Sequence, residues 1–143
     1  MRSRSRRLGF LATGAVVLTA GVLALPTGAF GAGPKGKAKP NKNLVNNSTV
    51  MVSAKGFPAN DSLVIVECNS NAKTSDQNAC DTSVIVGAVA NAKGVVAATP
   101  YTFRTGTIGD GTCNANQTCY IVVTEPSSTG LHALIKVKVS KSA

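Results

Sequence analysis

The sequence contains no tryptophan, one histidine and only six acidic residues among its 143. Aromatic residues make up 4% of the chain, so large side chains that anchor partners are scarce. No GxSxG motif supplies a nucleophile for the lone His132, and the acidic residues are scattered. The Gly-rich segment 105–112 lacks the Gly-Lys-Ser/Thr that ends a phosphate loop, so we expect a turn-rich connection there. These absences predict a protein that is not an enzyme.

The formal net charge is +9, but most of it lies in the first third of the chain. From Asn43 onward, seven lysines and arginines face six acidic residues, so this part carries only +1. A large basic DNA-binding face is therefore not expected on the folded body. The basic residues of the first third are Arg2, Arg4, Arg6, Arg7, Lys35, Lys37, Lys39 and Lys42.

Residues 1–32 have the three parts of a secretory signal peptide. A basic start at 1–7 precedes the apolar run 8–25, and small residues fill 26–32. We therefore expect export and an extracellular protein. A permanent membrane anchor is the alternative, because eighteen residues without charge can just span a bilayer.

Residues 33–43 form a Lys/Gly/Pro-rich stretch without a hydrophobic period. Such a segment cannot bury a face, so we expect a flexible, solvated arm. It acts either as a spacer or as a weak contact to anionic cell-wall polymers or the membrane surface.

In residues 44–141 the apolar residues recur with a period of two, and no segment has the pattern of an amphipathic helix. Short strands joined by Gly, Asn and Pro turns predict an all-β fold, an antiparallel sandwich of the immunoglobulin-like type. The strands are expected at 49–54, 63–68, 84–89, 95–98, 101–104, 120–124 and 131–139.

The four cysteines all lie in this second part of the chain. In a small exported domain they predict two disulfides, for which three pairings exist. The local pairing, Cys68–Cys80 with Cys113–Cys119, is favoured because each pair brackets a polar loop. A zinc site is disfavoured because there is no CxxC motif and no histidine at ligand spacing, so no metal is expected.

Six short segments of the second part of the chain occur in a characteristic order. They are TVMVSAKGF (49–57), LVIVEC (63–68), AC (79–80), RTGT (104–107), GTC (111–113) and CYIVV (119–123). Taken together, these segments resemble the neocarzinostatin family of actinobacterial enediyne apoproteins. The resemblance implies a seven-stranded immunoglobulin-like sandwich with a small disulfide-bonded lobe of two ribbons. It also implies a cleft that holds a reactive enediyne chromophore non-covalently, with DNA contacted only through that chromophore.

The resemblance also suggests the residues of a ligand site. Arg104 stands where the family has an aromatic residue that packs on the ligand, and Phe103 is next to it. An apolar ligand needs an apolar, aromatic lining, which this sequence has in part replaced by polar residues. The expected ligand-binding residues are Cys68, Cys80, Phe103, Arg104, Gly106, Ser127 and Ser128.

The function expected is that of a secreted, monomeric, non-enzymatic carrier, with antibiotic action and defence against bacteria arising from a bound chromophore. Its only cofactor would be that enediyne-like or other polycyclic compound, held without a covalent bond. The rival hypothesis is an extracellular immunoglobulin-like structural or adhesive module that binds no small molecule. Two or more aromatic side chains converging in the cleft would favour the carrier.

Removal of the signal peptide is the first testable prediction. Mass spectrometry of protein recovered from the culture medium should give an N-terminus between Phe30 and Gly33, because the small residues there suit a signal peptidase. A chain that still starts at Met1 or Arg2 and stays in the membrane fraction would identify an anchor instead.

Overall fold

The computed structural model describes residues 33–74, 77–126 and 131–141 and leaves the expected signal peptide outside its scope. These residues form nine strands and two short 3-10 helices. The strands are β1 (Lys35–Lys39), β2 (Ser48–Lys55), β3 (Ser62–Cys68), β4 (Val86–Val89), β5 (Val95–Phe103), β6 (Gly106–Ile108), β7 (Gly111–Cys113), β8 (Cys119–Thr124) and β9 (His132–Val137), and the helices are η1 (Ser70–Thr74) and η2 (Gln77–Ala79).

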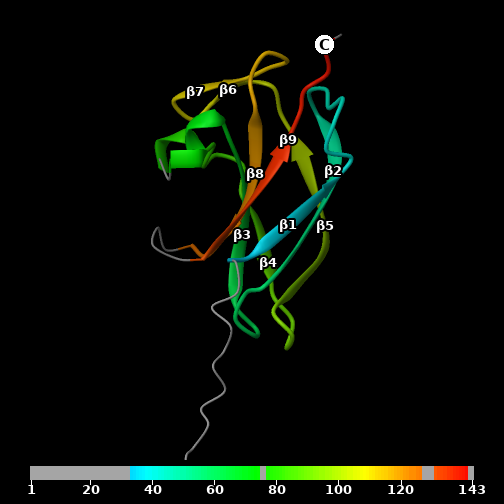
Figure 1. The fold of residues 1–143 in the computed structure, drawn as a ribbon, viewed down its shortest axis with the longest axis vertical. Helices are drawn as coiled ribbons and strands as arrows, with labels where there is room; N and C mark the ends of the chain where they lie inside the picture. Colours follow the sequence, from blue (N-terminus) through cyan, green and yellow to red (C-terminus); the bar gives the residue numbers. More distant parts are fainter. Residues whose placement is uncertain (1–32, 75–76, 127–130, 142–143) are drawn as a thin grey trace, which may run out of the picture.

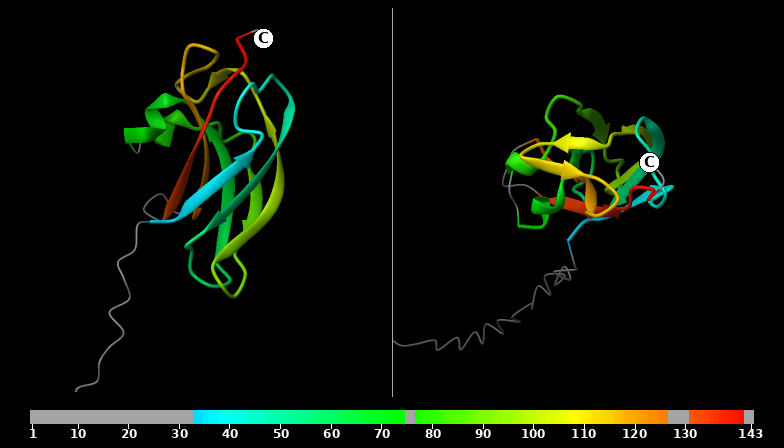
Figure 2. Two further views of the ribbon diagram at one scale, coloured as in Figure 1. Left: turned by 45° about the vertical axis from the view of Figure 1, so that its right-hand side comes forward. Right: turned by 90° about the horizontal axis from the view of Figure 1, so that it is seen from above.

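Seven of the strands build a two-layer sandwich (Figures 1 and 2). Strands β1, β2 and β5 form one antiparallel sheet, and β4, β3, β8 and β9 form the other in that order. One cluster of buried side chains from both sheets lies between the two layers. The predicted all-β, immunoglobulin-like sandwich is confirmed.

The core is built by strict alternation along the strands. In β9 the side chains of Ala133, Ile135 and Val137 are buried, whereas His132 and Lys136 are exposed. Successive side chains of a strand point to opposite faces, so one face of each strand enters the core and the other meets solvent. Burial of apolar side chains contributes about 1.5–3 kcal/mol each, which makes this layer the main source of stability.

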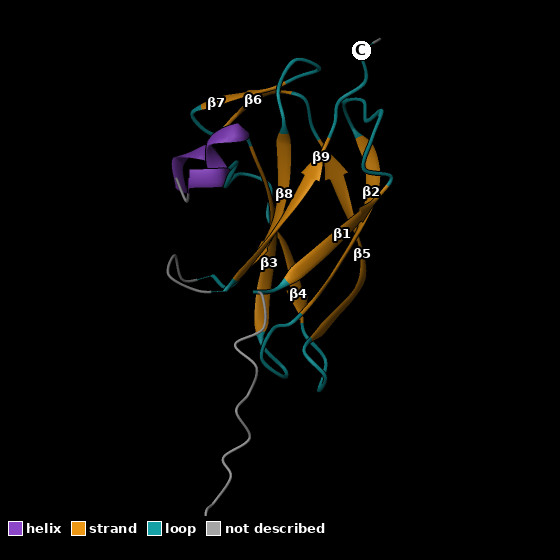
Figure 3. Cartoon of the chain, viewed as in Figure 1, coloured by secondary structure: helices purple, strands orange, loops and turns teal. Residues whose placement is uncertain are grey.

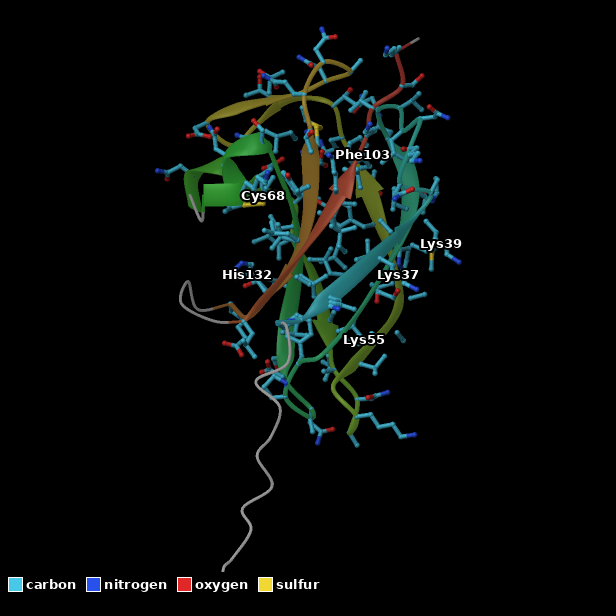
Figure 4. The ribbon with its side chains drawn as sticks, in the orientation of Figure 1. Lys37, Lys39, Lys55, Cys68, Phe103 and His132 are labelled. Atoms are coloured by element: carbon cyan, nitrogen blue, oxygen red, sulfur yellow. A yellow bond between two sulfur atoms is a disulfide. The ribbon has the colours of Figure 1, made fainter. Side chains whose placement is uncertain are left out.

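Strand β1 corrects the expectation of a flexible arm at residues 33–43. Lys35–Lys39 pairs antiparallel with β2, and its labelled lysines point outward (Figure 4). The small residues between the lysines face inward, where Ala38 is buried. A Cβ added to Gly36 would lie 2.5 Å from the side chain of Ile135, so only glycine allows β1 to approach β9 this closely. Alternation of lysine with glycine or alanine therefore suits an edge strand.

A small lobe, made of η1, η2 and the ribbon of β6 and β7, lies at one end of the sandwich (Figure 3). Segment 105–112, expected to be a turn-rich connection, instead forms most of the antiparallel ribbon β6–β7. Gly109 turns the ribbon with a φ of +57°, and a Cβ there would lie 2.2 Å from the backbone oxygen of Asn78. The resemblance implied a second ribbon, but the polar segment between Cys68 and Cys80 forms the two 3-10 helices and one isolated bridge.

The two disulfides pair locally, as predicted. Cys68–Cys80 joins Cα atoms 3.9 Å apart and closes the loop that holds η1 and η2. Cys113–Cys119 joins Cα atoms 5.6 Å apart and closes the loop between β7 and β8. Among the described residues, no helix is long and apolar enough to cross a membrane.

The contact between β1 and β9 makes a prediction about stability. Gly36→Ala should lower the free energy of unfolding by about 1–3 kcal/mol, because the new methyl group overlaps Ile135 and overpacks the core. Gly87→Ala in β4 is the matched control, since no atom lies within 4 Å of a Cβ there. Urea denaturation of both variants tests this, and equal midpoints would contradict the packing of β1.

Candidate functional site

The predicted site lies where the ends of β3 and β5 meet the disulfide Cys68–Cys80. The backbone N–H of Arg104, just after β5, donates to Oε2 of Glu67 at 2.9 Å. The backbone N–H of Asp81 donates to the carbonyl oxygen of Glu67 at 2.8 Å. Glu67 therefore ties the residue after β5 to the residue after Cys80.

Glu67 is a buried acid inside the sandwich, with 1% of its surface exposed. Its second oxygen, Oε1, has no hydrogen-bond partner among the described residues. Burial raises the pKa of Glu67 from 4.5 to about 7, although the hydrogen bond from Arg104 acts in the opposite direction. Burial, together with the charge of Glu67, also raises the pKa of the neighbouring Tyr101, whose hydroxyl lies 3.4 Å from the carbonyl oxygen of Val84.

The guanidinium of Arg104 lies outside the core and forms an ion pair with Asp81, with 3.2 Å between Nη1 and Oδ2. The Arg104 side chain is 44% exposed. Hydrogen bonds from the hydroxyl and the backbone N–H of Ser83 lower the pKa of Asp81, and the charge of Arg104 adds to this effect. An exposed pair of this kind contributes little to stability, so Arg104 is available to other partners.

Asn69 attaches the ribbon to the loop between Cys68 and Cys80. It is 1% exposed, and its Nδ2 donates to the carbonyl oxygen of Ile108 at 2.9 Å and to Oδ1 of Asp110 at 2.8 Å. Its Oδ1 accepts the backbone N–H of Asn71 at 2.8 Å. One buried amide therefore holds η1 and the β6–β7 ribbon together as a single lobe.

Under the lobe, the part of the outer sheet face that β3 and β8 form is apolar. One row of paired residues crosses β9, β8 and β3 through Leu134, Val122 and Val66. The next row on this face crosses the same strands through Lys136, Tyr120 and Cys68. Residues of η1 and η2 cover part of this surface, while Leu134 remains 37% exposed. We call Val66, Cys68, Tyr120, Val122 and Leu134 the lobe-side face.

The predicted ligand residues fall into three groups. Arg104 and Gly106 are exposed and Cys80 is half-buried, so these three have surface that a ligand can touch. Cys68 has no exposed surface but contributes to the lobe-side face. Ser127 and Ser128 lie outside the described residues.

Phe103 has to be corrected. It is 0% exposed and belongs to the core between the sheets (Figure 4), whereas the side chain of Arg104 is 44% exposed. A ring without exposed surface offers a ligand no contact, so Phe103 is not a ligand-binding residue. Of these two neighbours, the structure exposes only the cation of Arg104.

Sequence reasoning missed Glu67, Asn69 and Asp81, which organise the site. One indication was present for Glu67, because an acid inside the apolar run LVIVEC has no polar face to occupy. Asn69 and Asp81 each follow a half-cystine in a polar segment, and nothing in the pattern distinguishes them from their neighbours. Among the described residues, no three His, Cys, Asp or Glu side chains gather as metal ligands.

The fold is an immunoglobulin-like sandwich with a small lobe that is fastened by the disulfide Cys68–Cys80. The family model for the Neocarzinostatin family matches residues 37–140, so the chain belongs to the neocarzinostatin family. The solved structure of macromomycin has the same fold, with a TM-score of 0.56 at 22% identity over 74% of this chain and 98% of that one. No curated protein sequence matches the chain. Apoproteins of this family are secreted carriers rather than enzymes.

The buried acid predicts how stability depends on pH. Unfolded Glu67 loses its proton near pH 4.5, whereas the folded protein keeps it to about pH 7. Ionisation then favours the unfolded chain, so the free energy of unfolding should fall as pH rises from 4.5 to 7, by about 3 kcal/mol in total.

Glu67→Gln keeps the acceptor for the Arg104 N–H and removes the titration, so its stability should not share this fall. Urea denaturation of both proteins at several pH values measures the difference. Parallel curves for the wild type and Glu67→Gln would contradict the assignment.

Proposed function

We propose that this protein is a secreted, non-enzymatic carrier that holds a polycyclic chromophore without a covalent bond. Membership of the neocarzinostatin family over residues 37–140 is the observation that carries the proposal. The two local disulfides support it, because they suit an oxidising compartment outside the cell. The chromophore would supply the antibacterial activity and the only contact with DNA, and the carrier would act as a monomer.

The ligand would lie between the accessible edge of the lobe-side face and Arg104. Cys80 is half-buried and packs against the apolar cluster of that face, whereas Leu134 lies on β9, with β8 between it and β3. Asp81 follows Cys80 in the chain and holds Arg104 at 3.2 Å, so the apolar surface and the cation adjoin. Apolar surface with a few placed polar groups is the usual composition of a small-molecule site.

Arg104 determines which polycyclic ligands fit best. A guanidinium stacks on an aromatic face and also binds a carboxylate with two hydrogen bonds. A neutral ring system would gain only the first interaction, whereas an acidic or phenolic one would gain both. The carrier should therefore prefer acidic or phenolic polycyclic compounds to neutral ones.

Titration calorimetry with naphthoic acid and its methyl ester tests this preference. Arg104→Tyr should raise the affinity for the ester and lower that for the acid by about tenfold, the value of one charge-assisted contact. Asp81→Asn is the complementary variant: it frees Arg104 from its ion pair and should strengthen binding of the acid.

Heat that follows this pattern would support the carrier. If neither ligand binds to the wild type or to Arg104→Tyr, the carrier proposal fails and the adhesive module becomes the better hypothesis.

A further inference from the structure

A pocket of about 440 Å³ lies away from the site around Arg104, and no residue of that site lines it. Three segments form its walls: residues 42–43 before β2, residues 115–118 in the loop between β7 and β8, and residues 138–141 after β9. Its volume falls in the range of small-molecule sites, roughly 300–1,000 Å³. Nothing in the carrier hypothesis uses it.

The walls are fixed by covalent and backbone bonds. The disulfide Cys113–Cys119 closes the loop that carries 115–118. The backbone N–H of Leu44 donates to the carbonyl oxygen of Lys138 at 3.1 Å, and the backbone N–H of Ser140 donates to the carbonyl oxygen of Leu44 at 2.8 Å. The N–H of Lys138 donates in turn to the carbonyl oxygen of Asn41 at 3.0 Å. The backbone of the three segments that wall the pocket is therefore held in place by the fold.

The pocket is cationic. Segment 42–43 contributes Lys42, and segment 138–141, far away in the sequence, contributes Lys138 and Lys141. None of the described residues that line it is acidic, so no carboxylate of the lining neutralises these ammonium groups. Three cations around one hollow favour a ligand with at least two negative charges, because each is an anchor for an oxyanion.

Apart from Ala115 and Val139, the rest of the lining is polar, and it contains no aromatic ring. Asn43, Gln117 and Thr118 contribute amide and hydroxyl groups, which donate to and accept from the hydroxyl groups of a ligand. A nucleobase would find no ring to stack on, so a nucleotide gains nothing over a phosphate ester that lacks a base. We propose that this pocket binds a phosphorylated sugar or polyol that carries two or more negative charges.

Fructose 1,6-bisphosphate is the probe, titrated by calorimetry into the whole exported protein. Fructose, which has no phosphate, tests whether binding needs negative charge. Adenosine diphosphate, which has two phosphates and a nucleobase, tests whether a base improves binding. The triple variant Lys42→Met, Lys138→Met, Lys141→Met should weaken binding by about tenfold or more, because each exposed ammonium contributes part of a charge-assisted contact.

The control is Lys35→Met, Lys37→Met, Lys55→Met, which removes the same net charge from exposed positions of strands β1 and β2 that do not line the pocket. This variant should bind the bisphosphate like the wild type. Thermal denaturation establishes that both variants are folded, and the substituted lysines are all exposed.

The proposal is supported if the bisphosphate binds, fructose does not, and only the pocket variant loses affinity. Absence of binding to the wild type overturns it. Equal losses in both triple variants also overturn it, because they show general attraction to a basic protein. Tighter binding of the diphosphate would overturn the choice of ligand class.

Discussion

The pleat of the strands is the constraint on which both the core and the site depend. Two sheets pack face to face only when every second side chain enters the space between them. At the end of β3 this parity sends Glu67 inward and Cys68 outward, and at the end of β5 it sends Phe103 into the core. The disulfide, the buried acid and the exposed Arg104 are brought together because these two strand ends meet.

Glu67 couples the stability of the core to the position of the surface ion pair. Its carboxyl group accepts the Arg104 N–H, and its carbonyl oxygen accepts the Asp81 N–H, so one residue positions both members of the surface ion pair. A buried acid with one unsatisfied oxygen reduces stability unless it is protonated. The same acid accepts the two hydrogen bonds that hold Arg104 and Asp81 in place.

The lobe is held together by side-chain hydrogen bonds and a disulfide rather than by a buried core. Its segments are too short and too polar to form a hydrophobic core, and only a few residues of η1 and η2 reach the apolar face below. Asn69 and the disulfide Cys68–Cys80 replace that core with directional bonds. A lobe held in this way keeps its shape beside the sheet while leaving Leu134 accessible.

Much of the sandwich could be predicted because large β-branched residues mark the alternation, as in β3 and β9. Strand β1 has the same period, but glycine and alanine give too weak a hydrophobic signal, and the Lys/Gly/Pro composition indicated an arm instead. The lobe could not be predicted from periodicity, because its side-chain hydrogen bonds join Asn69 to residues about 40 positions away. For the same reason Glu67 could be suspected of burial, but not assigned its contact with Arg104.

The central claim is that the protein carries a small molecule, and native mass spectrometry with an absorbance spectrum tests it most directly. The protein would be purified under mild conditions from the organism that makes it. The account predicts a mass above that of the disulfide-bonded polypeptide, with an absorbing compound that organic solvent removes intact. A preparation whose native mass equals the polypeptide alone, and whose spectrum shows only tyrosine and phenylalanine, would contradict it.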